Sequence, residues 1–441
     1  MSVSAVNQLK TLLRSAFFKN VALLASGTLV AQLITLASTP VLSRLFLPAA
    51  FGILAILNSV VITLTGVTSL RYDMAIVLPA EDDDAANLLS LSLAILTTLT
   101  LITLLVITLG RVPLAEHLGQ PEAADWLWWV PPLIFISGLL QILSYWCSRH
   151  KEFRLLSISQ ITAAAISAGS KISAGVAALG PLGLVAGQAA GQIIALLVLL
   201  TRVLRDDFSR IRGAFSLERV RKVAYSYRDF PRYHALNSLI RGLTGSLPVF
   251  LFGVLFDTAT AGLYSMAYLL IKAPTMLVGS AIHQVYYQRA SEAVNKGHLL
   301  YPDFKRITLS LLAASLAPAP IVAWMCPSLF TFILGPEWIA SGHFARFLMP
   351  SLLTMMLSMP AHALALVLNH QRWFLGWQII ALILSTAGIG LGYVVDSPTA
   401  GVIGYSLTTS LMFIILILAM AARVRRVDSE GHRVYQGEDS H

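Results

Sequence analysis

The hydrophobic and polar positions of this chain alternate in long blocks. Twelve apolar stretches are separated by mostly short polar connections. A helix of about 20 residues spans the hydrocarbon core of a bilayer, so each stretch is predicted to be a transmembrane helix. The predicted spans are residues 20–43, 50–70, 86–110, 126–148, 155–178, 184–201, 234–256, 262–285, 307–333, 342–369, 374–394 and 401–421. We therefore expect an all-α, polytopic membrane protein.

The cations in the connections predict the orientation of these helices. An even number of spans places both termini on one side of the membrane. The connections and termini of that side carry 25 Lys and Arg residues, whereas the other side carries only Arg44 and Arg111. The positive-inside rule assigns the richer side to the cytoplasm. The first apolar stretch is longer than a signal-peptide core, so we expect it to remain as a spanning helix.

The composition agrees with a membrane protein. Hydrophobic residues make up 56% of the chain and charged residues 12%, which excludes a soluble globular domain. The formal net charge is +9, but the cations follow the membrane topology, so nucleic acid is not an expected partner. Cys147 and Cys326 both lie in apolar spans and are expected to be small buried hydrophobic residues.

The longest predicted cytoplasmic connection divides the twelve spans into two groups of six. It covers residues 202–233 and carries nine cations. We predict an N-terminal six-helix bundle at 1–201, a cytoplasmic basic linker at 202–233, a C-terminal six-helix bundle at 234–421 and a cytoplasmic tail at 422–441. Halves with an even number of helices share their orientation, so any internal repeat is of the parallel kind. Leu45-Phe46 and Gly52 recur 210 residues later as Leu255-Phe256 and Gly262.

Four cations lie inside predicted spans: Lys171, Arg241, Lys272 and Arg346. None of the 22 Asp and Glu residues does. A charge inside a membrane is costly unless it faces a cavity or a partner. Cations without carboxylates therefore predict a cavity for an anionic molecule. A phosphate or diphosphate fits, because Lys and Arg donate charge-assisted hydrogen bonds to it.

These cations differ in depth. Lys272 lies about 16 Å from the predicted outer end of its helix, near the membrane midplane, and is the best candidate for a ligand contact. Arg241, Lys171 and Arg346 lie close enough to a helix end to reach the surface by snorkelling. Arg44 and Arg71, at opposite ends of the first helical hairpin, either flank the two mouths of a cavity or anchor the hairpin at the interfaces.

Two further patterns predict local structure. Glu81-Asp82-Asp83-Asp84 precedes the third span, where negative charge at a helix N-terminus is favourable, so we expect a solvated cap. Small residues repeat every fourth position in the sixth span, at Gly183, Gly187 and Gly191, which predicts close approach of a neighbouring helix. Gln188 and Gln192 lie one turn apart in the same span and could line a polar path.

The sequence gives no support for an enzyme. Gly169-Ser170-Lys171-Ile172-Ser173 lacks the upstream glycine of a nucleotide-binding loop and lies inside an apolar span. The histidines and acids show no metal-ligand spacing, so we expect no metal and no cofactor. A membrane polysaccharide polymerase or ligase would need a large outer loop, and the longest predicted one is only 111–125.

Several motifs resemble those of the Wzx-type lipid-linked oligosaccharide flippases of the multidrug/oligosaccharidyl-lipid/polysaccharide (MOP) exporter superfamily. The resemblance extends from the first span to the last. It is carried by Arg71-Tyr72-Asp73-Met74-Ala75-Ile76-Val77-Leu78-Pro79, Phe230-Pro231-Arg232-Tyr233, Ala261-Gly262-Leu263-Tyr264, Lys272-Ala273-Pro274 and Gly335-Pro336-Glu337-Trp338.

This resemblance implies a fold and a function. The fold would be two six-helix bundles that form a V around a central cavity, which opens to each side in turn. The cargo would be an oligosaccharide repeat unit on undecaprenyl diphosphate, moved outward across the bacterial inner membrane for O-antigen, capsule or exopolysaccharide synthesis. Membrane lipid would be a partner, and a polysaccharide polymerase and a chain-length regulator are possible ones. The family's cation positions vary, so the resemblance assigns no individual residue.

Two other transport functions remain open. A multidrug or toxin exporter of the same superfamily would be favoured by an acidic residue in the first or seventh span, and neither span contains one. A flippase for the peptidoglycan precursor would carry a chemically similar cargo, but its known relatives usually have two additional helices. The sequence does not identify the sugars, the driving force or the oligomeric state.

Overall fold

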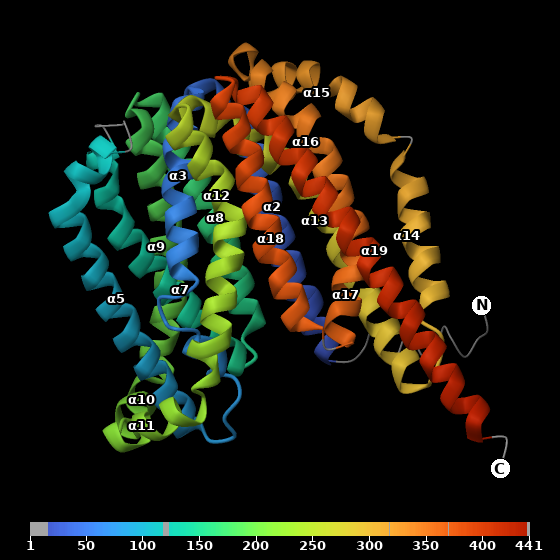
Figure 1. Ribbon diagram of the computed structural model, residues 1–441. Coiled ribbons are helices and arrows are strands. Elements are labelled where there is room, and N and C mark those ends of the chain that lie inside the picture. The colour runs from blue at the N-terminus through green and yellow to red at the C-terminus, as the bar shows by residue number, and fades with distance from the viewer. Residues whose placement is uncertain (1–15, 118–122, 317, 369, 439–441) are drawn as a thin grey trace. The chain divides into compact units, whose positions relative to one another are not determined.

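The computed structural model describes residues 16–117, 123–316, 318–368 and 370–438, and all regular structure in these ranges is helical (Figure 1). Within the described residues, every predicted span is mostly helical, which confirms the all-α prediction. The long helices are α2 (Ala16–Leu45), α3 (Pro48–Thr65), α5 (Asp82–His117), α7 (Val130–Arg149), α8 (Phe153–Val176), α9 (Gly180–Asp206), α12 (Ala235–Leu255), α13 (Thr258–Asn295), α14 (Tyr301–Leu316), α15 (Pro318–Leu334), α16 (Ile339–Leu357), α17 (Met359–Val367), α18 (Gln371–Val394) and α19 (Pro398–Glu438).

Other helices and turns connect these. They are α4 (Tyr72–Ala75), α6 (Ala123–Trp126), α10 (Phe208–Ala214) and α11 (Leu217–Ser226), with 3-10 turns at Leu127–Trp129 and Pro336–Trp338 and a π-helical turn at Phe230–His234. The 3-10 turn at Pro336–Trp338 follows Gly335, whose φ of 112° suits glycine. Trp338, at the end of this turn, is fully buried. Two of the motifs that carry the family resemblance, at 230–233 and 335–338, are therefore special backbone turns.

Fewer helices than predicted have the length and composition of a membrane span. Within the described ranges, nine helices are long and apolar enough to cross a bilayer, or ten if α14 and α15 form one span bent by 41°. Helices α8 and α13 are not among them. Pro318 begins α15 at the bend, where a proline has no N–H for the preceding turn. A total of twelve stays a prediction.

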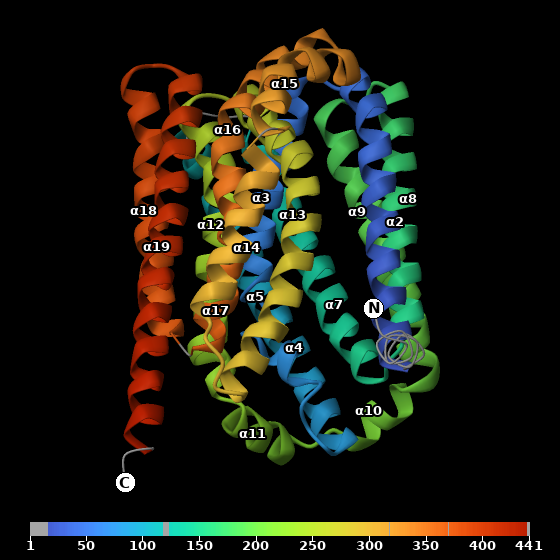
Figure 2. The ribbon, with the colours of Figure 1, turned by 90° about the vertical axis from the view of Figure 1, so that its right-hand side faces the viewer.

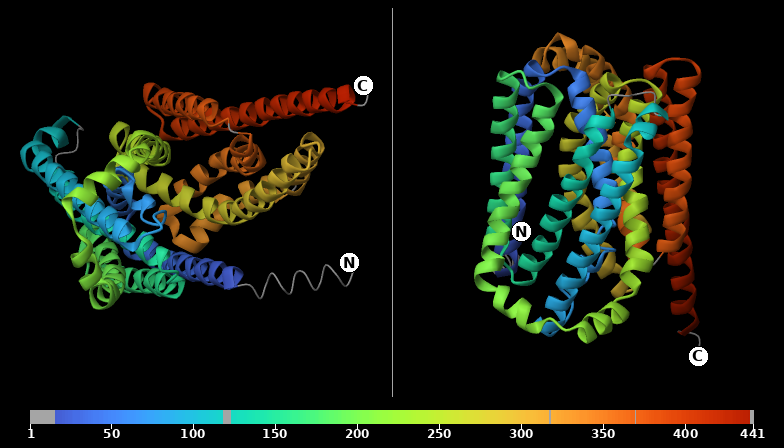
Figure 3. Two further views of the ribbon diagram at one scale, coloured as in Figure 1. Left: turned by 90° about the horizontal axis from the view of Figure 1, so that it is seen from below. Right: turned by 90° about the vertical axis from the view of Figure 1, so that its left-hand side faces the viewer.

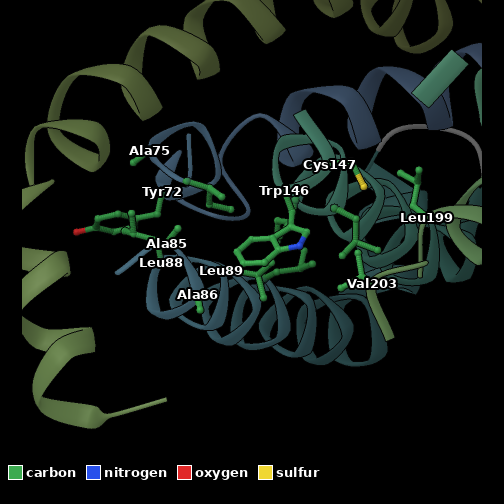
Figure 4. Packing of buried hydrophobic residues seen from close by; sticks show 14 of the residues in the cluster. Tyr72, Ala75, Ala85, Ala86, Leu88, Leu89, Trp146, Cys147, Leu199 and Val203 are labelled. Carbon is green, nitrogen blue, oxygen red and sulfur yellow. The ribbon is translucent and has the colours of Figure 1, made fainter. Parts of the chain in front are cut away.

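The chain divides into two compact units, Met1–Ser246 and Leu247–His441. The division lies inside α12, beyond the predicted linker, and the predicted bundle boundaries stay predictions. In the first unit, α8 packs against both α2 and α9 (Figure 2). A group of buried residues around Trp146 also joins α5 and α7, at the end where α5 begins (Figure 4). Cys147 belongs to this group, and Cys326 of the second unit is also buried, as predicted for both.

The small-residue repeat of α9 forms its contact with α8. A Cβ atom on Gly183 would lie 2.7 Å from the Ala174 Cβ, and one on Gly191 would lie 2.4 Å from the Ala163 carbonyl oxygen. Real Cβ contacts are not this short, so only glycine allows the observed approach of the two helices. The predicted close packing is confirmed, and its partner is α8.

In the second unit, α18 and α19 run side by side as two long helices (Figures 2 and 3). The indole Nε1 of Trp377 on α18 donates a 3.0 Å hydrogen bond to the Met412 carbonyl oxygen on α19. Helix α19 continues to Glu438, so residues 422–438 extend the last helix. Asp428 near its end accepts hydrogen bonds from the backbone N–H groups of Leu300 and Tyr301, at 3.1 and 2.8 Å, which attaches α19 to the start of α14.

The helix ends reproduce the faint sequence repeat. Helix α2 ends at Leu45 and α12 at Leu255, while α3 begins at Pro48 and α13 at Thr258. The two helix ends are 210 residues apart, as are the two helix starts, which is the offset of the repeated sequence. The repeated Leu-Phe pair therefore marks the same helix-to-helix turn in the two halves of the chain.

Candidate functional site

The six predicted cation positions lie in both units. The first unit contains Arg44, Arg71, Lys171 and Arg241, and the second contains Lys272 and Arg346. Arg44, Arg241 and Arg346 are exposed, and the other three are half-buried. Of these six cations, only Arg71 has a carboxylate within 4.0 Å among the described residues. The remaining five cations of this set have no ion-pair partner in the ranges that the structure describes.

Lys272 lies on α13 beside an aromatic ring. Its Nζ is 4.8 Å from the ring centroid of Tyr268, one turn earlier on the same helix. Tyr268 stacks on Tyr264, which is fully buried. The Tyr264 ring centroid lies 4.7 Å from that of Phe252 and 6.0 Å from that of Tyr405. A cation over an aromatic face is attracted by the ring quadrupole. The buried aromatic group thus holds the Lys272 ammonium in place without neutralising its charge.

Lys171 lies in the contact between α8 and α9. A Cβ on Gly187 would be 2.6 Å from the Lys171 Cγ, so the aliphatic part of the lysine covers this glycine. The side chain therefore has a packing function in addition to its charge.

Beside this contact, the two glutamines of α9 are hydrogen-bonded to other helices. Gln188 and Asn58 of α3 exchange two hydrogen bonds, at 3.1 and 2.5 Å, and Gln192 accepts one from Ser137 of α7 at 3.4 Å.

Arg71 belongs to a buried polar cluster that the sequence did not predict. The cluster is centred on Asp73 of α4, whose side chain is 0% exposed. Ser69 Oγ donates to one carboxylate oxygen at 2.6 Å, and Gln141 Nε2 of α7 donates to the other at 2.5 Å. Arg71 Nη1 lies 3.9 Å from the second oxygen. The carboxylate thus has hydrogen-bond donors and a counter-charge, as a buried acid requires.

The backbone of this turn is left-handed. Leu70 and Arg71 have φ values of 48° and 64°, which are uncommon for residues with a Cβ. The conformation directs the Arg71 side chain so that its Nε donates a 2.7 Å hydrogen bond to Ser238 Oγ on α12. Asp73 could have been noticed in the sequence, because it is flanked by Tyr72 and by Met74-Ala75-Ile76-Val77. A single carboxylate in such an apolar context is typical of a buried polar site.

The acidic run at the start of α5 is not a purely solvated cap, and the prediction was incomplete. Asp82 accepts from Arg149 at 2.9 Å and from Arg210 at 3.0 Å, and Asp83 pairs with Arg219 at 2.7 Å. Arg210 and Arg219 belong to the linker helices α10 and α11. The carboxylates therefore attach the linker helices to α5, and they also lie in the first turn of that helix.

A neighbouring tyrosine strengthens the same attachment. The Tyr72 hydroxyl donates a 3.0 Å hydrogen bond to the Ala224 carbonyl oxygen of α11, and burial raises the pKa of this phenol. The proton that makes this hydrogen bond is accordingly retained at neutral pH.

Solved structures identify the class of protein that has this fold. A multidrug resistance MATE family transporter of the MOP superfamily, in an inward-facing conformation, matches with a TM-score of 0.70 and 14% identity, over 90% of this chain and 96% of that one. The lipid II flippase MurJ, in an inward closed conformation, matches with a TM-score of 0.66 and 10% identity, over 94% and 93% of the two chains. These identities establish the fold alone, which is that of MOP superfamily transporters.

The sequence itself establishes the family. The chain belongs to the polysaccharide biosynthesis protein family, which matches residues 41–342. No curated protein matches the sequence. The family and the fold together confirm the resemblance found in the motifs, and the chain is a multi-pass membrane protein.

Proposed function

We propose that this protein is a flippase for undecaprenyl-diphosphate-linked oligosaccharide repeat units. It would move them from the cytoplasmic to the outer leaflet of a bacterial inner membrane, for O-antigen, capsule or exopolysaccharide synthesis. Membership of a polysaccharide biosynthesis family and a transporter fold support this proposal. Both termini would lie in the cytoplasm, as the distribution of Lys and Arg predicts. A polymerase and a chain-length regulator are candidate partners after translocation.

The observation that carries the proposal is the isolated positive charge of Lys272. It lies far from the helix ends of α13 and has an aromatic neighbour, with no carboxylate within 4.0 Å among the described residues. A permanent internal counter-ion would cancel the charge, whereas an anionic cargo supplies one transiently. A diphosphate offers the strongest charge-assisted hydrogen bonds to an ammonium or guanidinium group.

The proposed cycle uses the cations in their separate units. Arg241 on α12 and Lys272 on α13 would each contact the diphosphate during translocation, with Lys171, Arg44, Arg71 and Arg346 as further candidates. The polyprenyl tail would stay in the lipid, because burying its hydrocarbon in a polar passage is unfavourable. Binding must be strong enough to draw the head group from the membrane surface and weak enough to release it.

A ligand-stabilisation experiment tests the cargo class. Purified protein in detergent is heated with undecaprenyl diphosphate, undecaprenyl monophosphate, undecaprenol or a lipophilic cationic drug, because a ligand of the folded state raises the unfolding temperature. We expect the diphosphate to give the largest rise and Lys272→Ala to reduce it. Lys296→Ala, which removes an exposed cation paired with Glu292, is the matched control and should leave the rise unchanged.

Two outcomes would contradict the proposal. Equal stabilisation by undecaprenol would mean that only the tail is recognised. Stabilisation by the cationic drug with none by the diphosphate would favour a multidrug exporter, like the structurally similar multidrug resistance MATE transporter.

A further inference from the structure

The linker between α9 and α12 has one face fixed to α5. Asn87 of α5 is fully buried, and its Nδ2 donates to the Ala214 carbonyl oxygen at 2.9 Å while its Oδ1 accepts from the Ser216 N–H at 3.1 Å. These two contacts hold the turn between α10 and α11. Figure 2 shows both helices crossing the end of the first unit, beside the start of α5.

Asn87 also determines the depth of the linker relative to the predicted membrane. It is the second residue of the apolar stretch 86–110, so it lies where the predicted hydrocarbon region of α5 begins. The linker helices are held at this level, which corresponds to the headgroup region of the predicted cytoplasmic leaflet.

The nine linker cations divide into two groups. Three are paired with carboxylates: Arg202 with Glu152, before α8, and with Asp207, Arg210 with Asp82, and Arg219 with Asp83. The other six are exposed and have no ion-pair partner among the described residues. These six, which we call the linker face, are Arg205, Arg212, Arg221, Lys222, Arg228 and Arg232. The linker therefore uses its paired cations for attachment and directs the remaining ones outward.

Large apolar side chains are exposed between these cations. Phe215 is 57% exposed, Leu217 61% and Tyr225 68%, and the Arg228 guanidinium lies 4.4 Å from the Tyr225 ring centroid. Water is an unfavourable environment for such residues. Short helices that combine Lys and Arg with exposed aromatic and Leu residues are typical of segments that lie in the membrane interface.

We propose that the linker face binds anionic phospholipid headgroups of the predicted cytoplasmic leaflet. The cations supply charge complementarity to the lipid phosphates, and Phe215, Leu217 and Tyr225 insert beside them at the headgroup level. The exposed apolar residues favour a lipid surface over an acidic soluble protein, because cations alone would suffice for the latter. The contact is distinct from cargo binding and does not depend on the transported molecule.

The test uses the full-length protein in nanodiscs. Ser226→Cys places a single reactive thiol on the exposed end of α11, since Cys147 and Cys326 are buried. A fluorophore on this thiol is quenched by nitroxide carried on the headgroup of either phosphatidylglycerol or phosphatidylcholine, at equal mole fraction. We expect stronger quenching by the phosphatidylglycerol probe, with a preference that decreases at high salt.

Charge variants assign the preference to the linker face. Arg212→Gln/Arg221→Gln/Lys222→Gln keeps the attaching ion pairs and should reduce the preference about five-fold or more, the factor expected for each interfacial cation. Arg289→Gln/Lys305→Gln/Arg306→Gln removes three exposed cations from the second unit on the same predicted side and should leave it unchanged.

Three results would overturn the proposal. They are equal quenching by the two lipids, an unchanged preference in the linker variant, and no quenching by either probe. The last result would place α11 in the aqueous phase and favour an acidic protein as its partner.

Discussion

The Nε of Arg71 donates a 2.7 Å hydrogen bond to the Oγ of Ser238, which joins the turn after α3 to α12. The two helices also approach closely. A Cβ on Gly242 of α12 would lie 3.1 Å from the Thr63 Cα and 3.7 Å from the Thr63 Cβ on α3. By sequence, α3 belongs to the first half of the predicted repeat and α12 begins the second. Their contact lies toward the predicted cytoplasmic ends of both helices.

Cross-linking this contact should block transport. The 3.7 Å between the Thr63 Cβ and a Cβ at position 242 falls in the range of natural disulfides, so Thr63→Cys/Gly242→Cys should oxidise readily. We expect the oxidised protein to lose flux and the reduced protein to regain it, because the proposed alternating access would require the predicted cytoplasmic ends of α3 and α12 to separate. The measurement is lipid translocation in vesicles with and without reductant, and each single-cysteine variant is a control. Full flux in the fully cross-linked protein would show that this contact stays closed throughout the cycle.

Removing the buried carboxylate should destabilise the first unit. Asp73→Ala leaves Ser69, Gln141 and Arg71 without their acceptor, and we expect a loss of about 1–3 kcal/mol in unfolding free energy. The measurement is the unfolding midpoint of the purified protein in detergent. Asp125→Ala is the matched control, because its side chain is 85% exposed although it pairs with Arg111 at 3.4 Å. Equal midpoints for the two variants would mean that the Asp73 cluster adds no stability.

Transport should depend on the aromatic ring of Tyr268, beside Lys272, and not on its hydroxyl. Lys272→Ala should abolish flux while the protein still inserts normally. Tyr268→Phe keeps the aromatic face beneath the ammonium and should retain flux, whereas Tyr268→Ala should lower it several-fold, since a partly desolvated cation–π contact contributes about 1–2 kcal/mol. Flux and membrane abundance are measured in the same cells. Wild-type flux in Lys272→Ala would disprove its assignment as a cargo contact.

The glycine contact between α8 and α9 should tolerate no side chain. Gly191→Ala places a Cβ against the Ala163 carbonyl oxygen, which is backbone and cannot rotate away, so we expect a loss of about 1–3 kcal/mol. Gly169→Ala on α8 is the control, because nothing lies within 4 Å of its Cβ. That change should be neutral or stabilising by up to about 1 kcal/mol. Thermal unfolding in detergent compares the two, and similar midpoints would contradict the packing described.

Local patterns were sufficient to predict most of the fold. Apolar runs located the helices, because a bilayer requires long segments whose backbone hydrogen bonds are internal. The repeated Leu-Phe pair marked equivalent helix ends at Leu45 and Leu255, and the glycines of α9 indicated a close helix contact. Each of these signals is contained within one or two helices.

The candidate site required contacts that no local pattern contains. Gln141 bonds to Asp73 from 68 residues away, and Arg219 bonds to Asp83 from 136 residues away. Such partners are brought together only by the tertiary fold. For the same reason the sequence offered only a cavity mouth or an interfacial anchor for Arg71, whereas the structure gives it two partners. It predicted residues 202–233 only as a basic linker, without the contacts that hold it.

The proposed transport of a lipid-linked oligosaccharide across the inner membrane can be tested in cells that lack the gene. The measurement is mass spectrometry of undecaprenyl-diphosphate oligosaccharides, together with measurement of surface polysaccharide. We expect completed repeat units to accumulate on the cytoplasmic face, surface polymer to be lost, and complementation by the wild type, but not by Lys272→Ala, to reverse both effects. Unchanged lipid intermediates and normal surface polymer, in a strain with no second flippase, would contradict the claim.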